Sequence, residues 1–230
     1  MKSENNPPKH GELVPLFPLP QTVFYPNTLL PLHIFEPRYR HMMAEALEGG
    51  RKIGMVLLLP GWEENYYAAP PIATVGCVGE IEKHIRLEDG KYNMVLKGLH
   101  RFKIVGETEG KPYRRAKTEP LPEINDQSLI TGLNPLKEEM IRHCHQYIRL
   151  LPSGESIKKE MNLDSCKTLS HLTDQIAYQL NLTVEQKQTL LEEQDVLRRV
   201  DAIRSMLKMK IDIIHLSKMR THPGADVNLN

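Results

Sequence analysis

The sequence predicts an α+β protein with an N-terminal half rich in antiparallel strands and a helical C-terminal half. Six prolines stand within residues 14–40, at positions 15, 18, 20, 26, 31 and 37. They exclude a helix there, because each proline fixes φ, lacks a backbone donor and pushes its predecessor toward extended geometry. After residue 127 the apolar spacing changes from the period of two typical of strands to the period of 3.6 typical of helices.

The proline-rich stretch is expected to form short strand pieces and corners. Five apolar residues then recur with helical spacing and predict one helix inserted among the strands, between Pro37 and Gly49: Tyr39, Met42, Met43, Ala46 and Leu47. The continuous apolar run over 52–59 predicts a strand buried on both faces, and 61–71 predicts a loop.

Residues 74–86 and 92–97 predict two strands joined at Glu88-Asp89-Gly90, where Asp-Gly favours the positive φ values of a tight hairpin turn. Residues 100–105 and 113–118 are two further candidate strands. Gly76 and Gly79 lie within strand patterning and are expected at bulges or points of close packing.

The C-terminal half carries three helix-start signals. Asn134 with Pro135 predicts a capped helix, Thr183 with Gln186 has the form of a capping box, and Asp195 is placed to cap the last helix. We expect a β-rich part over 1–122 with disorder over 1–12, a helical bundle over 123–218, and a disordered tail over 219–230.

Composition narrows the classes of function. The 30 basic and 29 acidic side chains give a formal net charge of +1, so the chain has no global field to attract nucleic acid or an anionic membrane. Three cysteines without a Cys-x-x-Cys motif, and an N-terminus without an apolar signal segment, favour a cytoplasmic protein. The longest apolar run of the chain is far shorter than the ~20 residues that cross a bilayer.

Three segments carry a family resemblance. They are 16–40, with Leu16-Phe17-Pro18-Leu19 and Phe35-Glu36-Pro37-Arg38-Tyr39-Arg40; 75–102, with Val75-Gly76-Cys77-Val78-Gly79-Glu80-Ile81; and a weaker match over 190–200. Together they resemble the N-terminal substrate-binding domain of the ATP-dependent protease Lon, in a stand-alone bacterial form without the ATPase and peptidase domains. The resemblance implies a PUA-like barrel for the β-rich part and a substrate-recruiting role.

The sequence offers no motif for catalysis, a cofactor or a metal. The nearest approach to a phosphate-binding loop, residues 106–112, is one residue too short and has Pro112 where a hydroxyl must reach magnesium. Residues 143–145, His-Cys-His, are adjacent on a predicted helix and point about 100° apart, so they cannot converge on one ion. Cys144 is expected to pack as a small hydrophobe. Cys77 with His33 or His84 is a candidate thiol–imidazole pair, but the sequence shows no third orienting group and no oxyanion donor, which favours a structural role.

Two segments are candidates for peptide binding. One is the loop with Trp62, Tyr66 and Tyr67, which presents aromatic anchors or, alternatively, folds back over the barrel. The other is the charged turn with Phe35, Glu36, Arg38 and Arg40, whose charges alternatively serve as a salt bridge or helix cap.

The main functional hypothesis is a non-catalytic module that recruits unfolded or degradation-tagged proteins. Its further expected partners are an ATP-dependent protease and, through weak self-association, a second copy of the chain. The alternative from another class is RNA binding through a basic patch on the PUA-like barrel: Lys111, Arg114, Arg115 and Lys117. Protection of a strand edge by alternating charges explains the same four residues without RNA.

Overall fold

The computed structural model describes residues 10–66, 69–127, 134–152, 161 and 163–221. The chain forms two compact units: the sheet unit, Met1–Ile124 with Leu180–Gln194, and the helical unit, Asn125–Gln179 with Asp195–Asn230. Residues 1–9 and 222–230, for which the sequence predicts disorder, lie outside the described residues.

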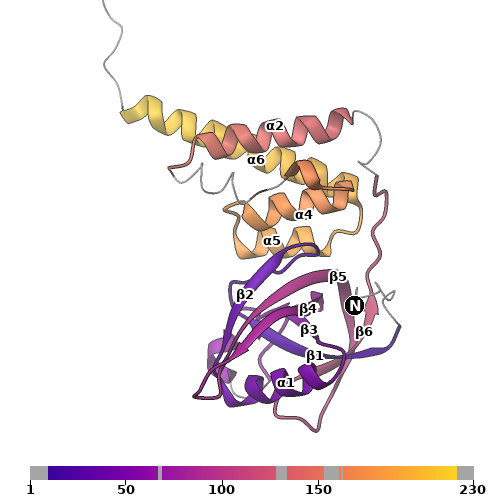
Figure 1. Cartoon of the computed structure of the whole chain (residues 1–230). Helices are drawn as coiled ribbons and strands as arrows, with labels where there is room; N and C mark the ends of the chain where they lie inside the picture. The colour runs from indigo at the N-terminus through magenta and orange to yellow at the C-terminus, as the bar shows by residue number, and fades with distance from the viewer. Residues whose placement is uncertain (1–9, 67–68, 128–133, 153–160, 162, 222–230) are drawn as a thin grey trace, which may run out of the picture. The chain divides into compact units, whose positions relative to one another are not determined.

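The sheet unit is built on six strands in the order β2-β5-β4-β3-β1-β6 (Figure 1). They are β1 Glu12–Leu19, β2 Leu29–Ile34, β3 Lys52–Leu57, β4 Val75–Arg86, β5 Tyr92–Thr108 and β6 Arg115–Pro120. An additional β5–β6 pairing closes the sheet into a ring-like arrangement rather than a true barrel. All pairings are antiparallel except β1 with β3. The predicted α+β class with one inserted helix is confirmed.

The strand prolines lie at positions where they need not donate a hydrogen bond to a neighbouring strand. In β1, residues 12–15 pair with β6 and residues 16–19 pair with β3, so Pro15 and Pro18 each have one strand in register beside them. A proline can therefore turn its nitrogen away from the strand that pairs there. Pro31 lies on β2, an edge strand that pairs with β5.

The inserted helix α1, Pro37–Glu48, buries the predicted stripe except for Leu47, which is half-buried. Tyr39 packs on Phe17 of β1 with ring centroids 4.4 Å apart, which fixes the start of the helix against the sheet. Inside the ring, Phe102 lies in a core cluster of fully enclosed apolar side chains: Val14, Leu16, Val56, Val78, Phe102 and Ala116.

The β4–β5 hairpin differs in two ways from the prediction. Gly90 has φ +77°, but Asp89 does not adopt a positive φ, so the turn needs one left-handed residue rather than two. The predicted strands 92–97 and 100–105 are one continuous strand, in which Leu99 is skipped in the register with Val78 and Gly79 of β4.

Helix α5, Val184–Glu192, belongs to the sheet unit although the sequence places it in the predicted helical bundle. The buried Arg101 of β5 donates from Nε to the Leu191 carbonyl at 2.9 Å and from a terminal nitrogen to Glu123 at 2.6 Å. Gln188 donates to the Val75 carbonyl at 3.1 Å. Long-range hydrogen bonds thus attach α5 to the strands. Where the functional domains divide stays a prediction.

The helical unit contains α2 Pro135–Arg149, the short 3-10 turn Leu163–Ser165, α4 Leu169–Gln179 and α6 Val196–Thr221. Its predicted caps are confirmed: Asn134 accepts from the amides of Leu136 and Lys137, and Asp195 accepts from Leu197 at 2.9 Å. In the sheet unit, the predicted capping box of Thr183 and Gln186 is also present at the start of α5.

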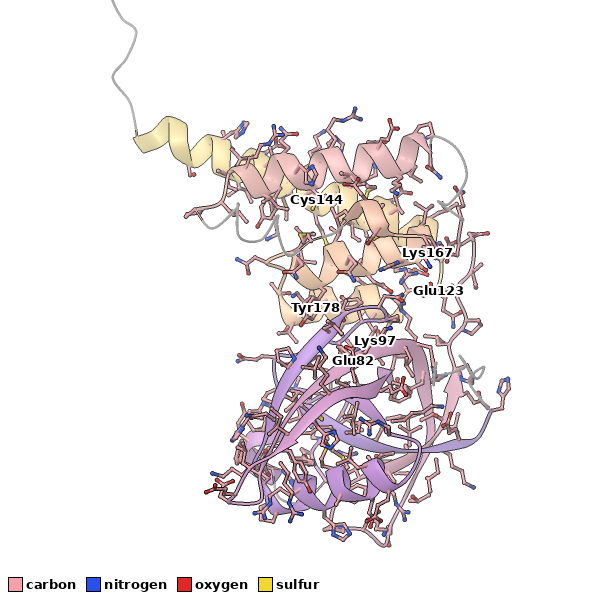
Figure 2. All side chains as sticks on the ribbon, in the orientation of Figure 1. Glu82, Lys97, Glu123, Cys144, Lys167 and Tyr178 are labelled. Carbon is pink, nitrogen blue, oxygen red and sulfur yellow. The ribbon has the colours of Figure 1, made fainter. Side chains whose placement is uncertain are left out.

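The interior of the helical unit contains a buried ion pair and a buried thiol. Arg199 of α6 bonds Asp174 of α4 at 2.9 Å, with both side chains almost fully enclosed. Cys144 on α2 is fully buried, as expected for a small hydrophobe (Figure 2). No helix among the described residues combines the length and apolarity required to span a bilayer.

Gly76 of β4 tests the close packing of the ring. A Cβ at this position would lie 2.3 Å from the Met55 carbonyl oxygen and 2.8 Å from Phe102 Cζ. We expect Gly76→Ala to destabilise the sheet unit by about 2–3 kcal/mol, because backbone and core must shift. Chemical denaturation followed by circular dichroism and by the fluorescence of Trp62, the single tryptophan, measures this loss.

Gly106 of β5 is the matched control, since a Cβ there would meet nothing within 4 Å. Gly106→Ala should change stability by less than about 0.5 kcal/mol. Equal losses for the two variants would contradict the packing explanation.

Candidate functional site

The two predicted peptide-binding segments meet at Arg38, in the first turn of α1. Its guanidinium forms an ion pair with Glu36 at 3.0 Å and donates to the Tyr66 carbonyl at 3.2 Å. It lies 4.6 Å from the ring centroid of Tyr39 and 4.7 Å from that of Tyr66. Trp62 contacts Tyr66 edge-on with centroids 5.4 Å apart. We call Glu36, Arg38, Trp62 and Tyr66 the Arg38 cluster.

Burial and a hydrogen bond within the Arg38 cluster keep the Tyr66 phenol protonated. Tyr66 donates its hydroxyl to Glu36 Oε1 at 2.5 Å. Burial first, and then the bond to Glu36, raises the pKa of Tyr66, so the phenol keeps the proton that it donates. Glu36 is the N-cap residue of α1, but its side chain makes no cap hydrogen bond. Of the salt bridge and the helix cap suggested for this turn, Glu36 therefore forms the salt bridge, with Arg38.

A cleft of about 580 Å³ opens beside Arg38 and Tyr66. We call it the Arg38 cleft; its lining is Pro18, Arg38, Tyr39, Leu58, Tyr66, Ala69, Pro70 and residues 107–114. Arg114 makes two bonds to the Glu107 carboxylate, at 2.5 and 2.7 Å, and a third to the Pro70 carbonyl. The cations of the cleft are therefore neutralised locally, and the cleft suits a polypeptide segment better than an isolated anion.

Glu45 of α1 holds the far wall of the cleft in place. Its carboxylate accepts from Lys111 at 2.5 Å and from the hydroxyl of Tyr113, and it lies 2.8 Å from His41 Nε2. Hydrogen bonds from Lys111 first and Tyr113 second lower the pKa of Glu45 to about 2. The same contact contributes, after burial, to raising the pKa of Tyr113 to about 12.

The basic patch considered for RNA is largely committed to internal partners. Lys111 is bonded to Glu45, Arg114 to Glu107, and Arg115 to the Glu109 carbonyl at 2.9 Å. This weakens the RNA hypothesis, because phosphate contacts need available cations. Edge protection is wrong as an explanation of these charges, since β6 pairs with both β1 and β5 and is not a free edge.

A second surface lies across three neighbouring strands. We call it the β2 groove. It is a groove of about 500 Å³ lined by residues 31–33 of β2, 93–95 of β5 and 83–85 of β4. Ile85 on its lining is 65% exposed. His33 bonds Asn93 at 2.7 Å across the strand pair and stacks on Phe35, which is 58% exposed, with ring centroids 6.1 Å apart. Two large apolar side chains at the groove, Phe35 and Ile85, thus stay exposed within the described part of the chain.

Arg40 joins neither surface. The Arg40 guanidinium lies against Gly90 in the β4–β5 turn. Tyr67 lies outside the described residues. Trp62 and Tyr66 are each partly exposed, so the loop is neither fully free nor buried over the sheet.

Comparison with known proteins matches residues 13–209 to the substrate-binding domain of the ATP-dependent protease La, or Lon. The chain belongs to this family. It is 28% identical over 207 residues to the Lon protease of Anaeromyxobacter dehalogenans, a match that covers 89% of this chain and 24% of that protein. Identity with Lon protease 2 of Myxococcus xanthus is 28% over 206 residues, covering 90% and 24%. The chain spans about a quarter of the length of these curated relatives.

Solved structures support the same fold. A Lon N-terminal domain protein from Xanthomonas campestris superposes with a TM-score of 0.60 at 22% identity, covering 84% of this chain and 98% of that one. The N-terminal domain of the Mycobacterium avium complex Lon protease gives 0.63 at 18% identity, covering 86% and 98%. Identities this low establish the fold of this Lon-type domain alone.

Sequence reasoning missed two parts of these Lon-type surfaces. It did not identify Ile85 and Met94 of the β2 groove, because alternation within a strand does not show which strand ends lack cover. In β4, all five residues from Glu82 to Arg86 are exposed; Figure 2 labels Glu82, the first of them. It also assigned Tyr113 and Lys111 no contact with Glu45, which lies 66 residues or more away in the chain.

The low pKa of Glu45 gives a prediction in acid. A carboxylate with a depressed folded-state pKa contributes stability above its ordinary value of 4.5, and that contribution is lost as the pH falls through about 2. Glu45→Gln should therefore be less stable than the unmodified protein at neutral pH. The difference should close as the pH falls from about 4.5 toward 2.

Denaturation curves recorded as a pH series measure that difference. Glu119→Gln, at an exposed carboxylate on β6, is the control and should show no comparable closing. A Glu45→Gln difference that is constant across the series would show that the carboxylate charge does not hold the cleft wall.

Proposed function

We propose that this chain is a non-catalytic recruiter of unfolded or degradation-prone polypeptides, and that the β2 groove is its main client-binding surface. The observation that carries the proposal is the pair of large apolar side chains at the groove, Phe35 and Ile85, both more than half exposed. Exposed apolar side chains are what distinguish an unfolded client from its folded form. A solvent-facing apolar groove with a polar rim is the complementary surface.

Clients are held in the groove through side chains rather than by adding a strand to β2. Gly98 of β5 donates to the Thr28 carbonyl at 2.9 Å, so these two residues form a hydrogen-bonded pair. In an antiparallel ladder such pairs alternate with non-hydrogen-bonded pairs, and Pro31, opposite Val95, belongs to the second kind. The backbone of Pro31 therefore points away from β5, toward the outer edge of the sheet. Proline has no donor to offer there, which protects the edge against pairing. Side-chain contacts tolerate many client sequences, as a recruiter requires.

The Arg38 cluster positions the segment that presents Phe35. The next residue, Glu36, is bonded to both Arg38 and Tyr66, so the backbone after Phe35 is fixed between α1 and the loop with Trp62. A held anchor loses less conformational entropy on binding than a mobile one. We therefore propose Phe35, Glu36, Arg38, Trp62 and Tyr66 as one binding region, with the Arg38 cleft as a secondary contact.

We further propose that the chain acts in the bacterial cytoplasm and that an ATP-dependent protease receives its clients. The relatives described above are bacterial Lon proteases. All three cysteines are buried, and burial raises the pKa of Cys144 to about 12 and of Cys166 to about 11. The thiols of Cys144 and Cys166 are therefore protonated at neutral pH and unsuited to nucleophilic catalysis.

The groove proposal is tested with a reduced, alkylated protein that stays unfolded, and with its folded form as a reference. Phe35→Asp and Ile85→Asp should each weaken binding of the unfolded protein by roughly tenfold or more, because a charge replaces buried apolar contact. Fluorescence anisotropy of the labelled client gives the affinities.

Val105→Asp is the matched control, since Val105 on β5 is 51% exposed and does not line the groove. It should bind like the unmodified chain. Unchanged affinity in both groove variants, or equal binding of folded and unfolded protein, would count against the proposal.

A further inference from the structure

Helix α6 carries two apolar stripes, and the helical unit uses one of them. The buried stripe packs within the unit and consists of Val196, Val200, Ile203, Leu207 and Ile211. The second stripe follows alternating steps of four and three residues: Ala202, Met206, Met209, Ile213 and Leu216. We call it the α6 seam. At about 100° per residue, its centre lies roughly 140° around the helix from the buried stripe.

The C-terminal part of α6 projects past the end of α2 (Figure 1). Met209 is 49% exposed, Ile213 is 56% exposed and Leu216 is 60% exposed. Met206 and Ala202 are half-buried. Three large apolar side chains in succession on one helical face are more than the scattered exposure that ordinary surfaces show.

We infer that the α6 seam pairs with the α6 seam of a second copy of this chain, as a short parallel two-stranded coiled coil. The alternating spacing of four and three is the heptad pattern, in which the apolar residues of two helices meet layer by layer. With Ile213 at position a, Leu216 is at position d. In parallel coiled coils, a β-branched residue at a with leucine at d favours two strands over three or four.

The charges beside the seam favour the same orientation. Lys210 occupies position e and Asp212 position g. In a parallel pair, Ser205 at g faces Lys210 of the second copy, and Asp212 faces Ser217 of the second copy. No like charges meet in that arrangement.

An antiparallel pair fails on the same two residues. The antiparallel register that joins every large residue of the seam brings Met209 opposite Ile213 and Met206 opposite Leu216. It also brings Lys210 near Lys210 of the second copy, and Asp212 near Asp212 of the second copy. Like charges at both flanks disfavour it.

The length of the α6 seam sets the strength of the pair. Its large residues, 206–216, span about one and a half heptads, where stable coiled coils use three or more. The buried area therefore falls at the low end for specific interfaces, and we expect a dissociation constant on the order of 10–1000 µM. The association is concentration-dependent.

Sedimentation equilibrium on the full chain tests the pairing. The average mass should rise from 26.4 kDa toward twice that value as concentration increases through the micromolar range. Ile213→Asp should abolish the rise, because a charge enters the seam. His215→Asp places the same charge on an exposed position of the same helix outside the seam and should leave the rise intact. A mass that stays monomeric at every concentration overturns the inference.

Cysteine cross-linking tests the orientation. In a parallel pair Ile213 faces itself, so Ile213→Cys alone should form a disulfide-linked dimer under mild oxidation. The native cysteines are buried and do not compete. A link that forms only in a mixture of Met209→Cys and Ile213→Cys chains would establish the antiparallel pair and overturn the orientation.

Client binding separates self-association from the β2 groove proposal. Ile213→Asp should bind the unfolded protein like the unmodified chain when both are measured at submicromolar concentration. A loss of client binding in Ile213→Asp, together with a mass that is always monomeric, would assign the α6 seam to clients and overturn the pairing. Failure of the groove variants leaves the mass measurement unaffected, so the two proposals fail independently.

Discussion

Burial of one guanidinium, that of Arg101, constrains much of the sheet unit. Arg101 is 2% exposed and bonds the Leu191 carbonyl and the Glu123 carboxylate. Removing a charged group from water is costly unless partners satisfy it. Those partners come from α5 and from the segment after β6, so both segments must return to the strands. The discontinuous composition of the sheet unit follows from this requirement.

Arg101 also lies midway along the strand that the two candidate surfaces share. Strand β5 pairs with β2 through its first half, with β6 through its second half, and with β4 along most of its length. The β2 groove uses residues 93–95 of β5, and the Arg38 cleft uses residues 107 and 108. Both surfaces therefore depend on one strand, which the buried Arg101 attaches to the Leu191 carbonyl and to Glu123.

Local signals in the sequence predict local structure well in this chain. The prolines predict extended pieces, and Asn134, Thr183 and Asp195 predict three helix starts that the structure confirms. The position of α5 was not predictable in this way, because it depends on bonds between residues 90 or more apart in the chain. The Arg38 cluster was half predictable: both segments are visible in the sequence, but their meeting depends on how the loop folds back onto α1.

The two apolar surfaces of the chain differ in the regularity that determines what each can bind. The β2 groove combines a proline, two histidines, an isoleucine and a methionine on three strands, and no repeat relates them. Such a surface accommodates varied side chains at modest affinity, as client recruitment requires. The α6 seam repeats with one period along one helix, so its complement must repeat in the same way. A second α6 meets that condition, whereas an extended client, with side chains every 3.3 Å rather than every 1.5 Å, does not.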